Sequence, residues 1–366
     1  MDLRKNNKQE RKRARWSDIR TQEKRRIFSR VVNTDKQQGS ILVLVLLIIS
    51  LLVVLVIESL HQMRVEATSA KIFTASVQGR ALARSGRIFM EFLLARDTEL
   101  DEEEGTKSDH YGEFWTGFLH QEEVAPPVFS SGELNASIRD EQGKFPINFL
   151  VDQNEFRLTY QQVFERLLQS EPLALEPEQV EIILDSVKDW LDSGEMPGEY
   201  GAEDDYYVFA KKDYACKDGP LASLAELMLV KGIDQELYHG RDGKPGLKDL
   251  LTVHSTGQIN INTAPAIILT ALVPDGIPRD TAREFSQEML LYRQTPEHFD
   301  FLHEKDWYRN RMSGYNDIHL PANMIGCQSR YFSALITAQV GSIPVIVYTV
   351  LKRDSEGIVT VHYEVQ

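Results

Sequence analysis

The sequence predicts an α+β protein in which a long N-terminal transmembrane helix packs on a small antiparallel sheet, with a large helical domain inserted into the sheet domain. Three patterns predict this class. An apolar run at residues 41–57 continues as an amphipathic helix. Alternating strand patterns occur near residues 133–139 and again after residue 331. Helical periodicity dominates the chain between these strands.

The apolar run at residues 41–57 is long enough to enter a membrane as a helix. It contains no charged side chain before Glu58. At ~1.5 Å per residue it reaches about 26 Å, which just spans a hydrocarbon core of ~30 Å. Apolar side chains then recur at steps of three and four as far as Leu93. We therefore expect one continuous helix, with a transmembrane segment at residues 40–58 and an amphipathic part at residues 59–96.

Charge is distributed unevenly about this run. Residues 1–38 carry 13 Lys or Arg against 5 Asp or Glu, a net charge of +8, whereas the rest of the chain has a net charge of −22. Because basic flanks stay in the cytoplasm, we expect a single membrane crossing with the bulk of the chain outside the cytoplasm.

The start of the apolar run does not have the pattern of an ordinary secretory signal, because no small-residue cleavage motif follows it. It resembles a prepilin-type signal, in which a membrane peptidase cuts after a glycine and the apolar helix becomes the mature N-terminus. The resemblance implies cleavage between Gly39 and Ser40, and removal of the basic leader at residues 1–39. Two positions depart from the pattern: Ser40 replaces the commoner Phe or Met, and Leu44 replaces the usual Glu. A subunit without that glutamate suits the tip of a filament; the alternative is a plain single-pass anchor.

The soluble region begins with a strand. Polar and apolar side chains alternate at residues 133–139, turn-forming residues follow at 140–143, and a second extended stretch is expected at 145–150. From residue 155 the apolar period becomes helical, and Pro177 occupies a helix-opening position. This middle region is therefore predicted to be mostly helical.

Strand patterns return at the end of the chain. Three β-rich runs, separated by turn signals, lie at residues 333–340, 343–352 and 358–365. They predict a closing antiparallel meander. The predicted divisions of the soluble region are the first sheet segment at 97–154, the inserted helical domain at 155–330 and the C-terminal strands at 331–366.

Two cysteines, Cys216 and Cys327, lie on the side of the membrane that is predicted to be oxidising. A disulfide is the expected state. It would close a loop of about 110 residues, which on the chain-entropy model is worth on the order of 4 kcal/mol. The alternative is two unpaired buried thiols, because sequence does not place them within bonding distance.

Five segments of the soluble region occur in an order that resembles one family. They are DEQGKFPINFL from Asp140, VKDWLD from Val187, GAEDDYY from Gly201, LAELMLVKGI from Leu224 and GQININTAP from Gly257. Together with the prepilin-type start, they resemble protein K of the type II secretion system, a minor pseudopilin. The resemblance covers the chain from about residue 36 to the end and implies a pilin-like α+β core with a large helical insertion.

The resemblance implies a structural subunit, and we expect no enzyme. Such proteins form a complex with minor pseudopilins I and J at the tip of a periplasmic pseudopilus. Other implied partners are the major pseudopilin, the prepilin peptidase and the inner-membrane secretion platform. The tip is thought to start assembly and to push folded exoproteins through an outer-membrane secretin. The expected location is the bacterial inner membrane, with most of the chain in the periplasm and no nucleic acid bound.

Residues 189–205 are rich in Asp and Glu. Glycine and proline in the same segment predict an irregular loop. Hard oxygen ligands on a bent loop suit calcium, and the family resemblance implies calcium in the helical domain. The expected ligands are Asp189, Asp192, Glu203, Asp204 and Asp205. The alternative is a solvated acidic surface. Paired carboxylates also serve glycoside hydrolysis, but the sequence fixes no separation between them.

DNA binding is the alternative function from another class. Residues 223–233 and 261–277 resemble helix-hairpin-helix segments, in which a glycine turn holds a DNA phosphate, so a membrane-tethered DNA receptor is conceivable. The ectodomain charge of −22 argues against it, because phosphate binding relies on Lys and Arg. Helical packing that shares the hairpin's shape is the favoured interpretation of both segments.

Overall fold

The computed structural model describes residues 3–105, 107–116, 132–210, 212 and 214–365, except for the side chains of residues 3–39 and 104. The chain forms two compact units, Met1–Thr74 and Ala75–Gln366. The second unit contains the sheet, the short helices and two hydrophobic cores.

The longest element is α1, Leu3–Glu104, which confirms one continuous helix through the apolar run and the amphipathic part. From Ser40 onward it contains a window that is long and apolar enough to cross a membrane. The side chains of residues 41–57 are all exposed within the chain, as expected if lipid is their solvent. From Ala75 the helix belongs to the second unit and begins to bury one of its faces.

A four-stranded antiparallel sheet has the order β1-β8-β9-β10. Its strands are β1 (Glu133–Asp140), β8 (Tyr331–Val340), β9 (Ile343–Asp354) and β10 (Gly357–Val365). The predicted first strand and C-terminal meander are therefore confirmed. Because β1 pairs with β8, the chain leaves the sheet after one strand, forms the helical region, and returns to the neighbouring position.

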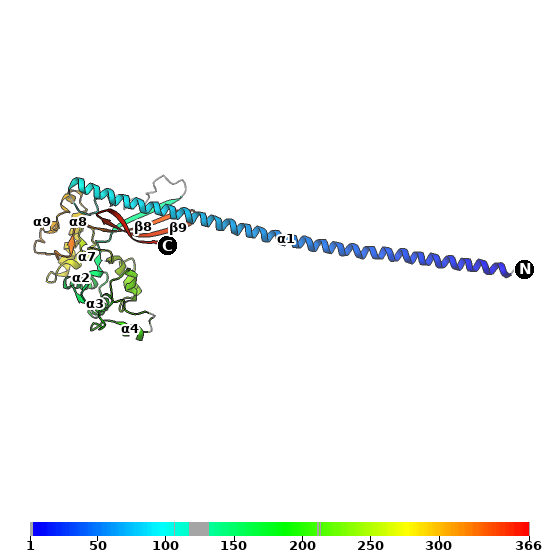
Figure 1. Ribbon diagram of the computed structural model, residues 1–366, viewed down its shortest axis with the longest axis horizontal. Coiled ribbons are helices and arrows are strands. Elements are labelled where there is room, and N and C mark those ends of the chain that lie inside the picture. Colours follow the sequence, from blue (N-terminus) through cyan, green and yellow to red (C-terminus); the bar gives the residue numbers. More distant parts are fainter. Residues whose placement is uncertain (1–2, 106, 117–131, 211, 213, 366) are drawn as a thin grey trace. The chain divides into compact units, whose positions relative to one another are not determined.

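The sheet packs against the part of α1 that belongs to the second unit, from Ala75 onward (Figure 1). Every second residue of β8 from Phe332 to Ala338 is buried, and these side chains meet Leu82, Met90 and Leu93 of α1. This alternation is what a sheet with one buried face requires.

Glycine allows α1 to approach the sheet closely at two places. A Cβ on Gly79 would lie 2.8 Å from Val345 Cγ2, and a Cβ on Gly86 would lie 2.9 Å from Ile336 Cγ2. Real Cβ atoms essentially never show such contacts, so larger residues would push the helix off the sheet. The two glycines are seven residues apart and therefore lie on the same face of α1.

The helical region between β1 and β8 is built from short elements around its own core. They are β2 (Phe145–Pro146), η2 (Ile147–Phe149), β3 (Val151–Asp152), β4 (Glu155–Phe156), α2 (Leu158–Gln169), α3 (Pro177–Leu191), α4 (Asp204–Phe209), η3 (Leu224–Leu229), α5 (Gln235–His239), α6 (Leu247–Leu250), β5 (Leu251–Thr252), β6 (Ile259–Asn260), α7 (Ala266–Leu272), α8 (Arg279–Gln294), η4 (Pro296–Phe301), α9 (Trp307–Arg311) and β7 (Ile325–Gly326). A short turn, η1 (Phe114–Thr116), precedes β1. The face of the sheet opposite α1 is near this region, since Leu335 and Tyr348 line a cavity of about 400 Å³ together with Tyr238 of α5.

Two elements differ from the sequence prediction. Residues 145–150 form a strand only at Phe145–Pro146, which pairs in parallel with β5, and then turn into η2. Asn148 fixes this turn, because its side chain exchanges hydrogen bonds with the backbone of Leu221 at 2.9 and 2.8 Å. Residues 224–229, expected as part of a helix, form the 3₁₀ turn η3 behind a Ser223 capping box.

Candidate functional site

The predicted cleavage point lies inside α1. Gly39 is a helical residue whose neighbour Ser40 is exposed. Neither the helix nor its burial tests cleavage, so processing after Gly39 stays a prediction.

The acidic stretch is organised around Asp189, which lies in the last turn of α3 and is 1 % exposed. Its carboxylate accepts backbone hydrogen bonds from Gly198 N at 3.0 Å and Ala202 N at 2.7 Å. The loop between α3 and α4 is thus folded over this one side chain. Glycine is required at position 201, because a Cβ there would lie 1.8 Å from Asp189 Oδ2.

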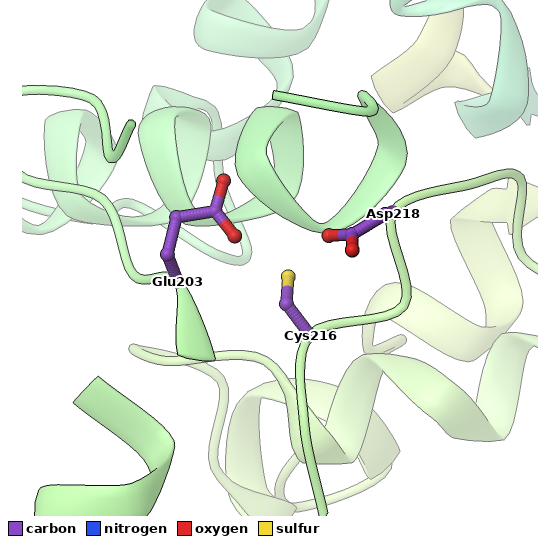
Figure 2. A group of neighbouring side chains, drawn as sticks. All are labelled: Glu203, Cys216 and Asp218. Atoms are coloured by element: carbon purple, nitrogen blue, oxygen red, sulfur yellow. The ribbon is translucent and has the colours of Figure 1, made fainter. Parts of the chain in front are cut away.

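Glu203, Cys216 and Asp218 form a compact group beside this loop, with their ligand atoms within 4.8 Å of one another (Figure 2). Figure 2 shows the two carboxylates facing each other with the Cys216 sulfur beside the space between them. Glu203 is 7 % exposed, and its Oε1 has no hydrogen-bond partner among the described residues. Burial, followed by the negative charges of Asp189 and Asp218, raises the pKa of Glu203 to about 7.

The group is well suited to a hard cation. A buried carboxylate oxygen without a partner is costly, and a bound cation would remove that cost. In the described part of the chain, the carboxylates of Asp189, Asp192, Glu203 and Asp218 form one ion pair, between Asp192 and Lys188 at 3.8 Å. The surplus is therefore negative, and oxygen ligands of this kind are those calcium prefers.

Three of the five predicted calcium ligands lie near one another in the structure, and two do not take part in the group. Asp189, Asp192 and Glu203 lie close enough for their charges to act on one another. Asp204 instead accepts the backbone N–H of Cys216 at 2.8 Å, and Asp205 is an exposed residue of α4. Asp218 was missed because it lies outside the acidic stretch, and no ligand spacing marks it.

The structure corrects the predicted disulfide, because Cys216 and Cys327 are both unpaired, buried thiols. They pack in different surroundings. Cys216 Sγ lies 3.4 Å from the carbonyl oxygen of Asp189, whereas Cys327 follows β7 and its carbonyl accepts the N–H of Asp109 at 2.8 Å. Burial raises the pKa of each thiol to about 12, so both are neutral.

The two helix-hairpin-helix-like segments do form glycine turns between helical elements. Gly232 separates η3 from α5 with φ +87°, and Gly276 separates α7 from α8 with φ +98°. Lys231, beside the first turn, donates to the carbonyl oxygens of Tyr200 and Gly201 at 2.8 and 2.9 Å. That lysine is engaged within the chain, which does not favour the DNA alternative.

A second buried charged cluster joins α1 to the sheet and was not predicted. Arg353 of β9 donates to Asp97 of α1 at 2.9 Å and to Asp109 at 2.6 Å. Glu113 lies beside them, and burial with the charge of Asp109 raises its pKa to about 11, so this carboxyl is neutral. The pairing spans 256 positions between Asp97 and Arg353, which no local pattern reveals.

Comparisons with known proteins agree on one family. Residues 143–240 match the family model for type II secretion system protein K. The chain is 28 % identical to type II secretion system protein K of Klebsiella pneumoniae over 261 residues, covering 69 % of this chain and 75 % of that protein. It is 27 % identical to the Pseudomonas aeruginosa protein over 239 residues, covering 64 % of this chain and 68 % of that protein.

The fold has a solved counterpart. A chain in the crystal structure of the GspK–GspI–GspJ complex from enterotoxigenic Escherichia coli matches with a TM-score of 0.54 at 19 % identity, covering 83 % of this chain and 99 % of that chain. The family is a structural component of the secretion machinery. The family model, the relatives and the matching fold together confirm the resemblance found from the sequence, which is a resemblance to type II secretion system protein K, a minor pseudopilin.

Proposed function

We propose that the chain is a minor pseudopilin that occupies the tip of the pseudopilus, where it helps start assembly and pushes folded exoproteins through the outer-membrane secretin. The observation that carries this role is Leu44, the fifth residue of the predicted mature chain. A pilin subunit normally has a glutamate there, a charge that is costly when buried without a partner. A subunit with leucine at this position needs no such partner, which suits the end of the filament.

The proposal includes processing and location. The prepilin peptidase cuts between Gly39 and Ser40, and the apolar part of α1 then anchors the mature chain in the bacterial inner membrane. The secretion platform receives it there, and the second unit lies in the periplasm. The charge asymmetry around the apolar run supports this orientation.

The proposed partners are minor pseudopilins I and J, and the major pseudopilin below them. Support comes from the matching solved chain, which is part of a GspK–GspI–GspJ complex. That likeness is one of fold.

We further propose calcium as a structural ligand of the helical region. The oxygens of Glu203 and Asp218 would hold it, with Asp189 and Asp192 contributing charge, and Asp204 and Asp205 nearby in the sequence. A bound calcium would supply positive charge to this group. The neutral Cys216 thiol would remain a packing neighbour, since calcium prefers oxygen ligands.

The N-terminal sequence and mass of the mature protein, measured with and without the prepilin peptidase, test the assignment. We expect a new N-terminus at Ser40 that depends on the peptidase. An intact leader in both strains would contradict processing and return the chain to the class of plain membrane-anchored proteins. Co-purification of the processed chain with pseudopilins I and J, in the presence of calcium, tests the tip role separately.

A further inference from the structure

The short helix α4 exposes an apolar surface that nothing in the described chain covers. Phe209 is 90 % exposed and Val208 is 70 % exposed, and Tyr206 and Tyr200 are 40 % and 39 % exposed. We call these four residues the α4 patch. Apolar side chains of this size exposed together, rather than singly, are typical of an interaction site.

The exposure follows from how α4 is anchored. Tyr207 is fully buried, with its ring 5.6 Å from Trp190 and 5.4 Å from Tyr214. Two helical positions correspond to ~200°, so Phe209 must point away from the core when Tyr207 points into it. Tyr206 and Val208 then lie on either side of Phe209. Burial of Tyr207 therefore fixes the exposure of Phe209 and its neighbours in the α4 patch.

Lys231 connects the loop before α4 to the helix. Its ammonium donates to the carbonyl oxygens of Tyr200 and Gly201 and lies 5.0 Å from the centroid of the Tyr206 ring. The two tyrosines are thus neighbours in space, and the charge of Lys231 is used to hold them together. The α4 patch combines residues of the loop and of the helix in one surface.

The border of the α4 patch is acidic. Asp204 and Asp205 form the first turn of α4, and Asp205 is one turn from Phe209 on the same outward face. On the loop side, Tyr200 N donates to Asp185 Oδ2 at 2.9 Å, and the charge of Glu199, followed by that of Glu181, raises the pKa of the Tyr200 phenol. Carboxylates therefore lie on both the helix side and the loop side of the apolar centre, and the exposed Lys212, just after α4, interrupts this acidic border.

We propose that the α4 patch docks a cationic amphipathic segment of another protein. An apolar side chain of the segment packs on Phe209, Tyr206 and Val208, and its Lys or Arg residues lie against the surrounding carboxylates. The acidic border disfavours other occupants. Nucleic acid and anionic lipid would be repelled, and a second copy of this chain would bring the same negative border against itself. The inference concerns a binding surface and does not depend on a place at the filament tip.

The test uses the full-length chain reconstituted in phosphatidylcholine vesicles. The probe is a synthetic helical peptide of leucine and lysine in which one leucine is replaced by a benzophenone amino acid, and photo-crosslinks are mapped by mass spectrometry. We expect crosslinks at residues 200–209. A matched peptide with glutamate in place of lysine should crosslink at least about tenfold less at these residues.

Two variants separate the contributions. Phe209→Ser should lower the crosslink yield about tenfold, because it removes the centre of the contact. Leu291→Ser is the matched control: Leu291 on α8 is 66 % exposed and lies outside the patch, so its removal should change nothing. Asp205→Asn should weaken binding and reduce its dependence on salt. Unchanged melting temperatures verify that all three variants are folded.

Three results would overturn the proposal. The first is crosslinking outside residues 200–209 with none inside them. The second is equal yield from the lysine and glutamate peptides, or from the wild type and Phe209→Ser. The third is stronger labelling of the α4 patch by a benzophenone-bearing phosphatidylcholine than by the peptide, which would make the patch a lipid-facing surface.

Discussion

Replacing Arg353 with leucine should strongly destabilise the second unit of the chain. Arg353 is the one cation paired with Asp97 and Asp109 among the described residues, and these side chains are only 3 % and 1 % exposed. Leucine preserves apolar contact with the ring of Phe332, over which the guanidinium lies at 4.9 Å. The variant therefore isolates the loss of charge. Breaking a buried ion pair by removing one partner costs about 3–5 kcal/mol, because it leaves an uncompensated buried charge.

The loss should depend on pH in a defined direction. Burial already raises the pKa of Asp97 to about 6, and Arg353 counteracts this rise. Without the arginine the pKa in the folded state rises further, while the unfolded carboxyl keeps its ordinary value near 4. A folded state that binds the proton more tightly gains stability as pH falls. The loss in free energy of unfolding of Arg353→Leu, relative to the wild type, should therefore be largest near pH 8 and should become smaller toward pH 5.

The assay is urea unfolding of the full-length chain in detergent, followed by tryptophan fluorescence at both pH values. Arg241→Leu is the control, since that arginine is exposed and pairs with Glu236 at 2.8 Å on the surface. Such a pair is worth about 1 kcal/mol or less. A loss below about 1 kcal/mol for Arg353→Leu, or a loss that is equal at both pH values, would refute the electrostatic account.

Three further predictions concern the acidic region and the thiols. Gly201→Ala should lower the melting temperature by several degrees, because its Cβ meets a buried carboxylate oxygen at 1.8 Å; Gly219→Ala, with its nearest neighbour at 3.9 Å, should change little. Millimolar calcium should raise the melting temperature, because a ligand at 100 times its Kd adds about 2.7 kcal/mol to the free energy of unfolding. Glu203→Gln should remove this rise, and an equal rise in the variant would exclude the site. Alkylation after denaturation without reductant should modify both Cys216 and Cys327. An unalkylated chain whose mass is lower than that of the reduced chain by two hydrogen atoms would instead show a disulfide.

The parts of the fold that the sequence predicted are those specified by local patterns. The apolar run predicts the helix α1 at residues 41–57, and alternation with the glycine turn at Gly341 predicts β8 and β9. Pro177 likewise marks the start of α3. In each case the period of the side chains and the turn residues lie within one short window, which is where sequence reasoning is strong.

The parts that could not be predicted depend on residues that meet only in three dimensions. β2 is limited to Phe145–Pro146 because its partner β5 offers only Leu251 and Thr252 for pairing, and this partner lies more than a hundred positions away in the sequence. The group of Glu203, Cys216 and Asp218 requires Asp218 to lie beside Glu203. A turn of the chain brings these two residues together, and no sequence motif marks them. Cys216 and Cys327 are free thiols because they pack in separate surroundings. The number of cysteines in a sequence does not give the distance between their sulfur atoms.

Gly79 and Gly86 of α1 allow only one position of the helix along the sheet. If the helix slid along its axis by one turn, about 5.4 Å, the residue facing Ile336 in place of Gly86 would be Leu82 or Met90, according to direction. Either side chain is far too large for a gap where even a methyl group would lie at 2.9 Å. Sliding of the part of α1 from Ala75 onward is thus blocked by Ile336 and Val345, so this part of the helix and the sheet move together.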